Sequence, residues 1–205
     1  MRLLLFSDVH CDATAASRLV ELSERVDVVV GAGDFASARH GLDELCDVLR
    51  EIRKPMVVVP GNAESDEELR RVWHDTPLVH VLHGSGCTID GQAFWGVGGA
   101  VPITPFGAWS FDLSEDQASA LLDPCPTGAV LVTHSPPYGV LDHGTRGVSL
   151  GSREVLSTIR RRTPPLAVCG HIHGSSGRTA SIGPTIVVNA GPRGVVHVLS
   201  RDRSV

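Results

Sequence analysis

The sequence predicts an α/β fold with two sheets, the first parallel and the second partly antiparallel. Two observations support this prediction. Short runs of branched apolar residues alternate with helix-like periodicity through the first half of the chain, which is the pattern of parallel βαβ units. Asp, Asn or His residues directly follow several of these runs, and an α/β scaffold carries its chemistry at such strand ends.

The first half alternates strictly between the two kinds of element. We expect strands at 2–7, 26–31 and 56–60 and helices at about 13–25, 38–53 and 64–73. From residue 78 the runs become shorter, and Gly84-Ser85-Gly86 and Asp90-Gly91 are typical of hairpin turns. The remaining expected elements are strands at 78–82, 87–90, 92–97, 128–133, 166–170, 185–190 and 195–199, helices near 114–122 and 149–161, and a loop at 135–148.

Composition is that of a globular chain of enzyme size. With 205 residues and 42% hydrophobic content, we expect one domain over 1–205. No apolar run is long enough to span a bilayer and no three-part secretory signal is visible, so we expect a cytoplasmic protein without membrane contact. Five cysteines without a Cys-x-x-Cys pair are expected to be free thiols. A formal charge of −5 with dispersed Arg and Lys disfavours duplex nucleic acid as a partner.

Seven potential metal ligands each follow an apolar run. The pairs Asp8-x-His10 and His171-x-His173 suggest side chains on one face of a period-2 backbone. Gly33 and Gly61 precede two further candidates and permit a sharp exit from a strand. A lone histidine after a strand is more often structural, but the conjunction of all seven favours a metal site. The candidates are Asp8, His10, Asp34, Asn62, His134, His171 and His173.

These residues fall into five motifs that resemble the signature of the calcineurin-like metallophosphoesterases. In chain order the motifs are Asp8-Val9-His10, Gly33-Asp34, Gly61-Asn62-Ala63-Glu64, His134 and Gly170-His171-Ile172-His173. The resemblance covers nearly the whole chain and implies a four-layer α/β/β/α sandwich with two mixed sheets. It also implies a dinuclear centre with Asp34 shared by both ions. One ion would be held by Asp8, His10, Asp34 and His173, and the other by Asp34, Asn62, His134 and His171.

The donor set indicates which chemistry such a centre can perform. Mixed imidazole and oxygen donors suit manganese, which we favour, or iron, nickel, zinc or cobalt better than magnesium or calcium. Two divalent ions, two carboxylates and a bridging hydroxide leave about one positive charge, which suits an anionic phosphate ester. We expect that hydroxide to attack phosphorus in line, without a covalent enzyme intermediate. Neutral Asn62 preserves the Lewis acidity of the ions, so Asn62→Asp should weaken catalysis.

The chain departs from the fullest form of the family at Ala63. Many members have a histidine there that steadies the phosphate and protonates the leaving group, a kind of assistance that contributes about 10²–10⁴-fold. Small members often lack it and are commonly phosphodiesterases, so we expect small phosphodiesters, nucleotide-type ones among them, as substrates. Ala63→His should then raise hydrolysis of esters with poor leaving groups. Substitute proton donors are His74, His80, His83 and His143, of which His143 is preferred, and Arg146 is the candidate to bind a phosphate oxygen.

Two alternatives remain open. A phosphomonoesterase or protein phosphatase of the same fold is disfavoured by Ala63, and a non-catalytic metal-binding scaffold is disfavoured by the intact ligand set. The aromatic side chains of Phe106, Trp109 and Phe111 could stack a nucleobase, although a hydrophobic plug over the second sheet is the commoner role. The sequence does not predict an oligomeric state.

Overall fold

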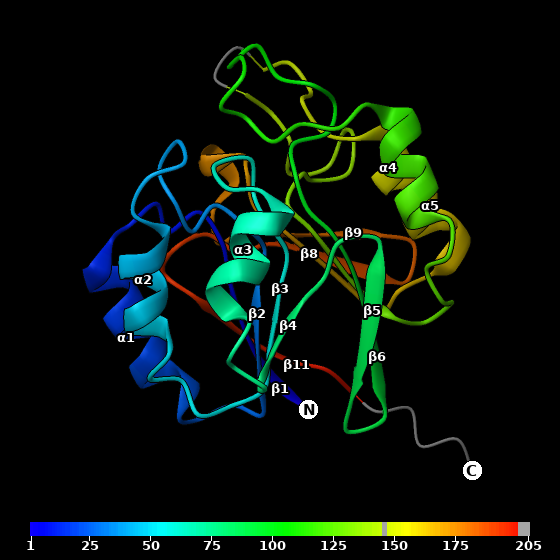
Figure 1. The fold of residues 1–205 in the computed structure, drawn as a ribbon. Helices are drawn as coiled ribbons and strands as arrows, with labels where there is room; N and C mark the ends of the chain where they lie inside the picture. The colour runs from blue at the N-terminus through cyan, green and yellow to red at the C-terminus, as the bar shows by residue number, and fades with distance from the viewer. Residues whose placement is uncertain (145–146, 201–205) are drawn as a thin grey trace.

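The computed structural model describes residues 1–144 and 147–200, and it has the four layers that the resemblance implies. Two mixed sheets lie face to face, with one set of helices outside the first sheet and another outside the second (Figure 1). The helices of the first set are α1 (Ala13–Ser23), α2 (Leu42–Leu49) and α3 (Asp66–Trp73), and those of the second are α4 (Glu115–Leu122) and α5 (Arg153–Arg162).

The first sheet has the strand order β11-β1-β2-β3-β4. Its four consecutive strands are parallel, as the βαβ alternation predicts, and β11 pairs antiparallel with β1 at the edge. The strands are β1 (Arg2–Phe6), β2 (Val28–Gly31), β3 (Met56–Val58), β4 (Val79–Val81) and β11 (Val195–Val198).

The second sheet has the strand order β5-β6-β7-β8-β10-β9. Its central pairs are parallel and its two outermost pairs are antiparallel, which confirms the expected mixed character. The strand β9 (Thr179–Ile182) was not predicted. The others are β5 (Ser85–Ile89), β6 (Gln92–Val97), β7 (Val130–Thr133), β8 (Leu166–Cys169) and β10 (Thr185–Asn189), and a short 3-10 turn, η1 (His173–Ser175), follows β8.

Three apolar layers hold the four structural layers together. Along β1, Leu4 and Phe6 pack toward the helices α1–α3, whereas Leu3 and Leu5 pack between the sheets. A third cluster fills the space between the second sheet and α4 and α5. Because both faces of the central strands are buried, these strands are continuous apolar runs in the sequence. Within the described ranges, no helix combines the length and apolarity needed to cross a bilayer.

Two expected elements differ from the structure. The helix predicted at 38–53 begins only at Leu42, because the preceding loop has left-handed backbone at Ala38 and Arg39, which a helix cannot accommodate. Gly84-Ser85-Gly86 is not a hairpin turn, since β4 belongs to the first sheet and β5 to the second. Asp90-Gly91 is a hairpin turn as predicted, with φ values of 49° and 80° between paired Ile89 and Gln92.

Candidate metal centre

The loops that follow strands of both sheets bring the predicted ligands together. Two groups form, and within each group the potential ligand atoms lie within 4.8 Å of one another. Asn62 belongs to neither group, but its Oδ1 lies 3.1 Å from Nε2 of His134. The first group contains Asp8, His10 and His173, and the second contains Asp34, His134 and His171.

Asp34 lies between the two groups. Its Oδ2 is 3.4 Å from Nε2 of His10, and its Oδ1 is 3.4 Å from Nε2 of His134. Each carboxylate oxygen therefore faces a histidine of a different group. This is the arrangement that a carboxylate shared by two cations requires.

Hydrogen bonds to backbone carbonyls fix the orientation of two of these histidines. Nδ1 of His10 lies 3.0 Å from the Ala36 oxygen, and Nδ1 of His134 lies 2.8 Å from the Ala32 oxygen. A carbonyl can only accept, so each Nδ1 donates, and in the neutral ring each Nε2 keeps a free lone pair. Nε2 of His10 also lies 3.2 Å from Nε2 of His173. Converging imidazole nitrogens and carboxylate oxygens fit divalent transition metals.

Four of the seven candidate ligands project from left-handed backbone rather than from extended strand. The φ values are 55° at Asp8, 45° at His10, 57° at Asp34 and 65° at His171. The expectation that Asp8 and His10 share a face through period-2 alternation is therefore wrong, because β1 ends at Phe6. Non-glycine residues adopt this conformation at an energetic cost, and such strain clusters at functional sites.

Two of the glycines that precede candidate ligands, Gly33 and Gly61, act for different reasons. Gly33 has a φ of 88°, which confirms the predicted sharp exit from β2. Gly61 has no such conformation, but a Cβ there would lie 2.1 Å from both the backbone nitrogen and Oδ1 of Asp34. Gly61 is thus required for space, because the Asp34 loop passes directly against it.

Glu64 is a positioning residue that the sequence did not reveal. Its buried carboxylate accepts hydrogen bonds from the backbone nitrogens of Asp34 (2.9 Å), Ala36 (2.9 Å) and Gly61 (2.6 Å). Burial, and then the charge of Asp34, raise the pKa of Glu64 to about 7. The carboxylate joins the loops after β2 and β3. Its sequence signal was its place in the Gly-Asn-x-Glu motif.

Two further polar side chains hold the ligand loops. Ser7 donates to Oδ2 of Asp8 at 2.5 Å and accepts from the Gly191 nitrogen at 2.8 Å. Nδ2 of buried Asn189 donates to the carbonyl oxygens of Gly170 (3.0 Å) and Ile172 (3.2 Å), on either side of His171. Both residues therefore connect the ends of the chain to the candidate centre.

Charge in the metal-free site is concentrated on Asp34 and His134. Burial alone would raise the pKa of Asp34, but the charge and hydrogen bond of His134, with His10, lower it well below its ordinary value. Burial alone would lower the pKa of His134, but the Asp34 carboxylate raises it to about 9. Burial, and then the charge of His134, lower the pKa of His171 to about 3. Binding of a cation near neutral pH would therefore require a proton to leave His134, whereas His171 would already be neutral.

His143, the preferred proton donor, is not a member of either ligand group. The side chain of His143 is 60% exposed, and its Nδ1 lies 3.6 Å from Oδ1 of Asp142. Arg146, the candidate for binding a phosphate oxygen, lies outside the described residues.

The other three histidines that could donate a proton have structural surroundings. His83 is partly buried, which lowers its pKa, and it accepts from the Gly98 nitrogen at 3.2 Å. His74 is exposed, and its Nδ1 donates to the Arg71 carbonyl oxygen. His80 is half-buried within β4. None of the three belongs to either ligand group.

Ala63 and the aromatic loop can also be placed. Ala63 is 1% exposed and packs in the apolar layer beneath α1–α3, so an imidazole there would have to displace buried side chains. Phe106 and Trp109 stack on each other, with ring centroids 5.5 Å apart, and both are exposed. Phe111 instead packs on His83, and its nitrogen donates to the Asn62 carbonyl oxygen at 2.9 Å.

Comparison with known proteins identifies the class to which this fold and site belong. The calcineurin-like phosphoesterase superfamily domain matches residues 1–199. The chain therefore belongs to the calcineurin-like metallophosphoesterases, as the five motifs indicate.

Its curated relatives include the human metallophosphoesterase domain-containing protein 1, which is 39% identical over 116 residues, covering 53% of this chain and 33% of the relative. A UPF0046 protein of Caenorhabditis elegans is 30% identical over 186 residues, covering 80% of this chain and 62% of the relative. The chain thus spans between a third and two thirds of the length of these proteins.

Solved structures share the fold at low sequence identity. The protein TT1561 of Thermus thermophilus superposes with a TM-score of 0.74 and 20% identity, over 94% of this chain and 90% of that one. A novel archaeal phosphodiesterase superposes with a TM-score of 0.53 and 15% identity, over 93% of this chain and 84% of that one. At these identities the likeness shows the fold alone.

Proposed function

We propose that this metallophosphoesterase is a phosphodiesterase for small diesters, nucleotide-type ones among them, with two divalent ions, manganese favoured. The observation that carries the proposal is the pair of ligand groups between which the Asp34 carboxylate faces a histidine of each, His10 and His134. Asp8, His10, Asp34 and His173 would hold one ion, and Asp34, Asn62, His134 and His171 the other.

When bound, the two ions supply Lewis acidity toward the phosphoryl oxygens and acidify the water that attacks phosphorus. Residues of the chain orient the candidate ligands. The Ala32 and Ala36 carbonyl oxygens orient His134 and His10, and Ser7 orients Asp8. The amide of Asn62 contributes an oxygen donor without cancelling the positive charge that attracts the substrate.

The preference for diesters rests on the replacement of the family's histidine by Ala63. A phosphodiester carries one negative charge and needs less neutralisation than a monoester dianion, so it depends less on the missing imidazole. His143 remains the proposed proton donor and Arg146 the proposed phosphate-binding residue. His143→Ala should then slow hydrolysis of alkyl esters, which need a proton, more than that of p-nitrophenyl esters, which do not.

Two coarser features complete the proposal. We take 1–205 as one domain, which the match over 1–199 supports. We place the protein in the cytoplasm, and the five free cysteines support this.

The test is hydrolysis of a chromogenic diester and its matching monoester by chelator-stripped protein, with manganese, nickel, zinc or magnesium restored singly. We expect restored activity that is greater on the diester. Greater monoester activity would favour the phosphomonoesterase, and no activity at full metal occupancy would favour the interaction scaffold. Asp47→Asn, at an exposed carboxylate far in sequence from any ligand, is the control for unspecific charge effects.

A further inference from the structure

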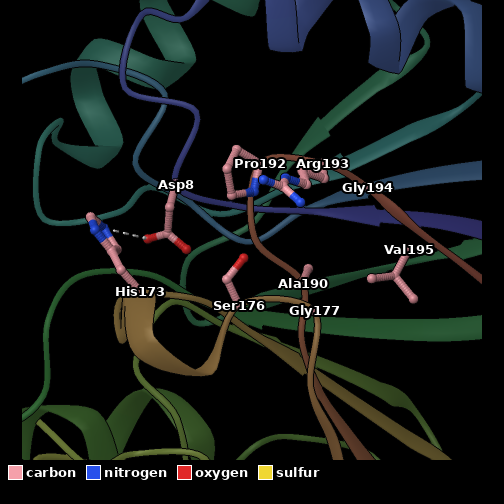
Figure 2. Close-up of a pocket in the computed structure, with 9 residues that line it drawn as sticks. All are labelled: Asp8, His173, Ser176, Gly177, Ala190, Pro192, Arg193, Gly194 and Val195. Atoms are coloured by element: carbon pink, nitrogen blue, oxygen red, sulfur yellow. Dashed lines mark ion pairs between the residues drawn. The ribbon is translucent and has the colours of Figure 1, made fainter.

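A cavity of about 500 Å³ opens beside the candidate metal centre. Asp8 and His173 of the first ligand group form one end, and the turn that connects β10 to β11 forms the other (Figure 2). Because two of the candidate metal ligands, Asp8 and His173, line this cavity, a phosphate bound at the centre would have room to direct one of its substituents into it. The remaining lining residues are Ser176, Gly177, Ala190, Pro192, Arg193, Gly194 and Val195.

Arg193 is the cation in this lining. Some exposed arginines have carboxylate partners, such as Arg71 with Asp43 and Arg70 with Asp66, whereas others, such as Arg18 and Arg178, have none within the described residues. For the Arg193 guanidinium the described part of the chain provides no hydrogen bond or ion pair. Asp8, the acidic residue of the same cavity, already accepts from Ser7 and from the His171 nitrogen. The guanidinium is therefore available to an anion that enters from solvent.

The turn that carries Arg193 is held firmly relative to the ligands. The Gly191 nitrogen donates to Ser7, which in turn donates to Asp8, so one hydrogen-bonded chain joins the turn to a metal ligand. A Cβ on Gly191 would lie 1.7 Å from Oγ of Ser176. A Cβ on Gly194 would lie 2.9 Å from Leu19. Close packing of both glycines fixes the distance between the centre and the turn.

The rest of the lining defines what the cavity can hold. The hydroxyl of Ser176 rises from the opposite wall toward the turn (Figure 2), and it offers a hydrogen-bond donor. Ala190, Pro192 and Val195 give an apolar stretch beside the two polar groups. A substrate group with a short aliphatic linker that ends in an oxyanion matches this lining. The linker would contact the apolar residues, and the oxyanion would contact the two polar groups.

We propose that Arg193 and Ser176 form a subsite for a second negative charge on the substrate, a carboxylate or a second phosphate joined by a short linker to the reacting phosphate. The inference rests on the proposed function in one respect, that the reacting phosphate binds at the metal centre. It extends that function by naming the substrate class as phosphoesters with an additional anionic group. Guanidinium binds both kinds of oxyanion through paired N–H donors.

Binding without turnover tests the subsite directly. Manganese-loaded protein is titrated by calorimetry with 2-carboxyethylphosphonate, ethane-1,2-diphosphonate and propylphosphonate, whose C–P bonds cannot be hydrolysed. We expect one or both of the compounds with a second anionic group to bind about tenfold more tightly than propylphosphonate. Comparison of 2-carboxyethylphosphonate with ethane-1,2-diphosphonate distinguishes a carboxylate from a phosphate as the second group. Arg193→Gln should remove this preference and Arg193→Lys should restore part of it. Arg178→Gln, at a nearby exposed arginine that does not line the cavity, should retain it.

Equal binding of all three phosphonates, or a preference that survives Arg193→Gln, would overturn the subsite. Turnover of 2-carboxyethyl and propyl p-nitrophenyl phosphate separates this result from the proposed function. If both esters are hydrolysed with equal kcat/KM, the phosphodiesterase stands and the subsite fails. If the phosphonate preference is present but neither ester is hydrolysed with any metal, the subsite stands and the phosphodiesterase fails.

Discussion

The two ligand groups are built differently, although they lie side by side. In the group of Asp34, His134 and His171, the His134 side chain is 0% exposed. In the group of Asp8, His10 and His173, the His173 side chain is 64% exposed. His134 thus belongs to the protein core and His173 to the protein surface, although Asp8 in the group of His173 is buried as Asp34 is.

Hydrogen bonds hold candidate ligands in both groups, and the groups differ chiefly at His173. Asp34 accepts from the Ala63 nitrogen, its own backbone is held by Glu64, and His134 is held by the Ala32 carbonyl oxygen. In the exposed half the His173 side chain contacts His10 and Asp8, both of them candidate ligands themselves. Asp8 and His10 are themselves held, by Ser7 and by the Ala36 carbonyl oxygen, so the exposed half differs through His173, which borders the cavity that a substrate would enter. This division predicts one firmly held ion and one that exchanges.

Removal of the shared ligand should have the largest effect. Asp34→Asn takes away the carboxylate that both groups contact, so we expect both ions to be lost from dialysed protein and turnover to fall by about 10³-fold or more. Metal content by mass spectrometry and initial rates measure the two effects. Retention of two ions per chain would mean that Asp34 is not shared.

Loss of the Glu64 carboxylate, which holds the ligand loops without being a candidate ligand, should have the next largest effect. Glu64→Gln keeps the shape, but its amide nitrogen cannot accept, so at least one of the three hydrogen bonds from backbone nitrogens is lost and metal affinity or activity should fall about 10- to 100-fold. Fluorescence-monitored metal titration and rate measurements test this. Glu67→Gln, at an exposed position in the same segment, is the matched control and should change neither. An equal loss of metal affinity or activity in both variants would mean that the removal of any negative charge in this segment causes the effect, and not the loss of the Glu64 hydrogen bonds.

The contrast between the halves can be measured by restoring metal stepwise. Manganese added to stripped protein should bind in two phases, with dissociation constants that differ about tenfold or more. Hydrogen bonds that hold metal ligands in place change metal affinity by such a factor. His173→Ala should remove only the weaker phase, and His134→Ala the tighter one. If His173→Ala removes the tighter phase, the proposed order of the sites is reversed.

The smallest effect concerns Ala63. Ala63 is 1% exposed within an apolar layer. An imidazole at this position would therefore not be placed to give the gain in activity that the sequence led us to expect from Ala63→His. We expect instead a loss of about 1–3 kcal/mol in the free energy of unfolding, with no gain on poor leaving groups. Urea denaturation and alkyl-ester hydrolysis test the two parts. Ala63→Ser serves as a small polar control.

The sequence predicted the architecture well where burial leaves a strong pattern. The strands β1, β2, β3, β7 and β8 are apolar on both faces, and each was predicted. The edge strand β9 was missed because Thr179–Ile182 alternates between exposed and half-buried positions without an apolar run. Glu64 was overlooked because an acid just before α3 resembles an ordinary residue of a helix start, although the helix begins only at Asp66.

The seven ligand candidates were identified from the sequence, but the geometry that unites them was not. Motif spacing does not reveal the left-handed backbone at Asp8, His10 and His171, since φ depends on the tertiary contacts that compensate its cost. Nothing in the sequence indicated that Arg193 lines the same cavity as Asp8. These relations arise from the packing of chain segments that are distant in sequence.

The pairing of β1 with β11 has a consequence for biosynthesis. Arg2 and Val198 are partners across this edge, and Asp8 leaves the ribosome long before the His171 and His173 that it contacts. A nascent chain therefore offers an ion only fragments of the donor set, and the complete set exists once the last motif has been translated. The complete centre can therefore form only after the last motif has folded against the first, where the His171 nitrogen donates to Asp8.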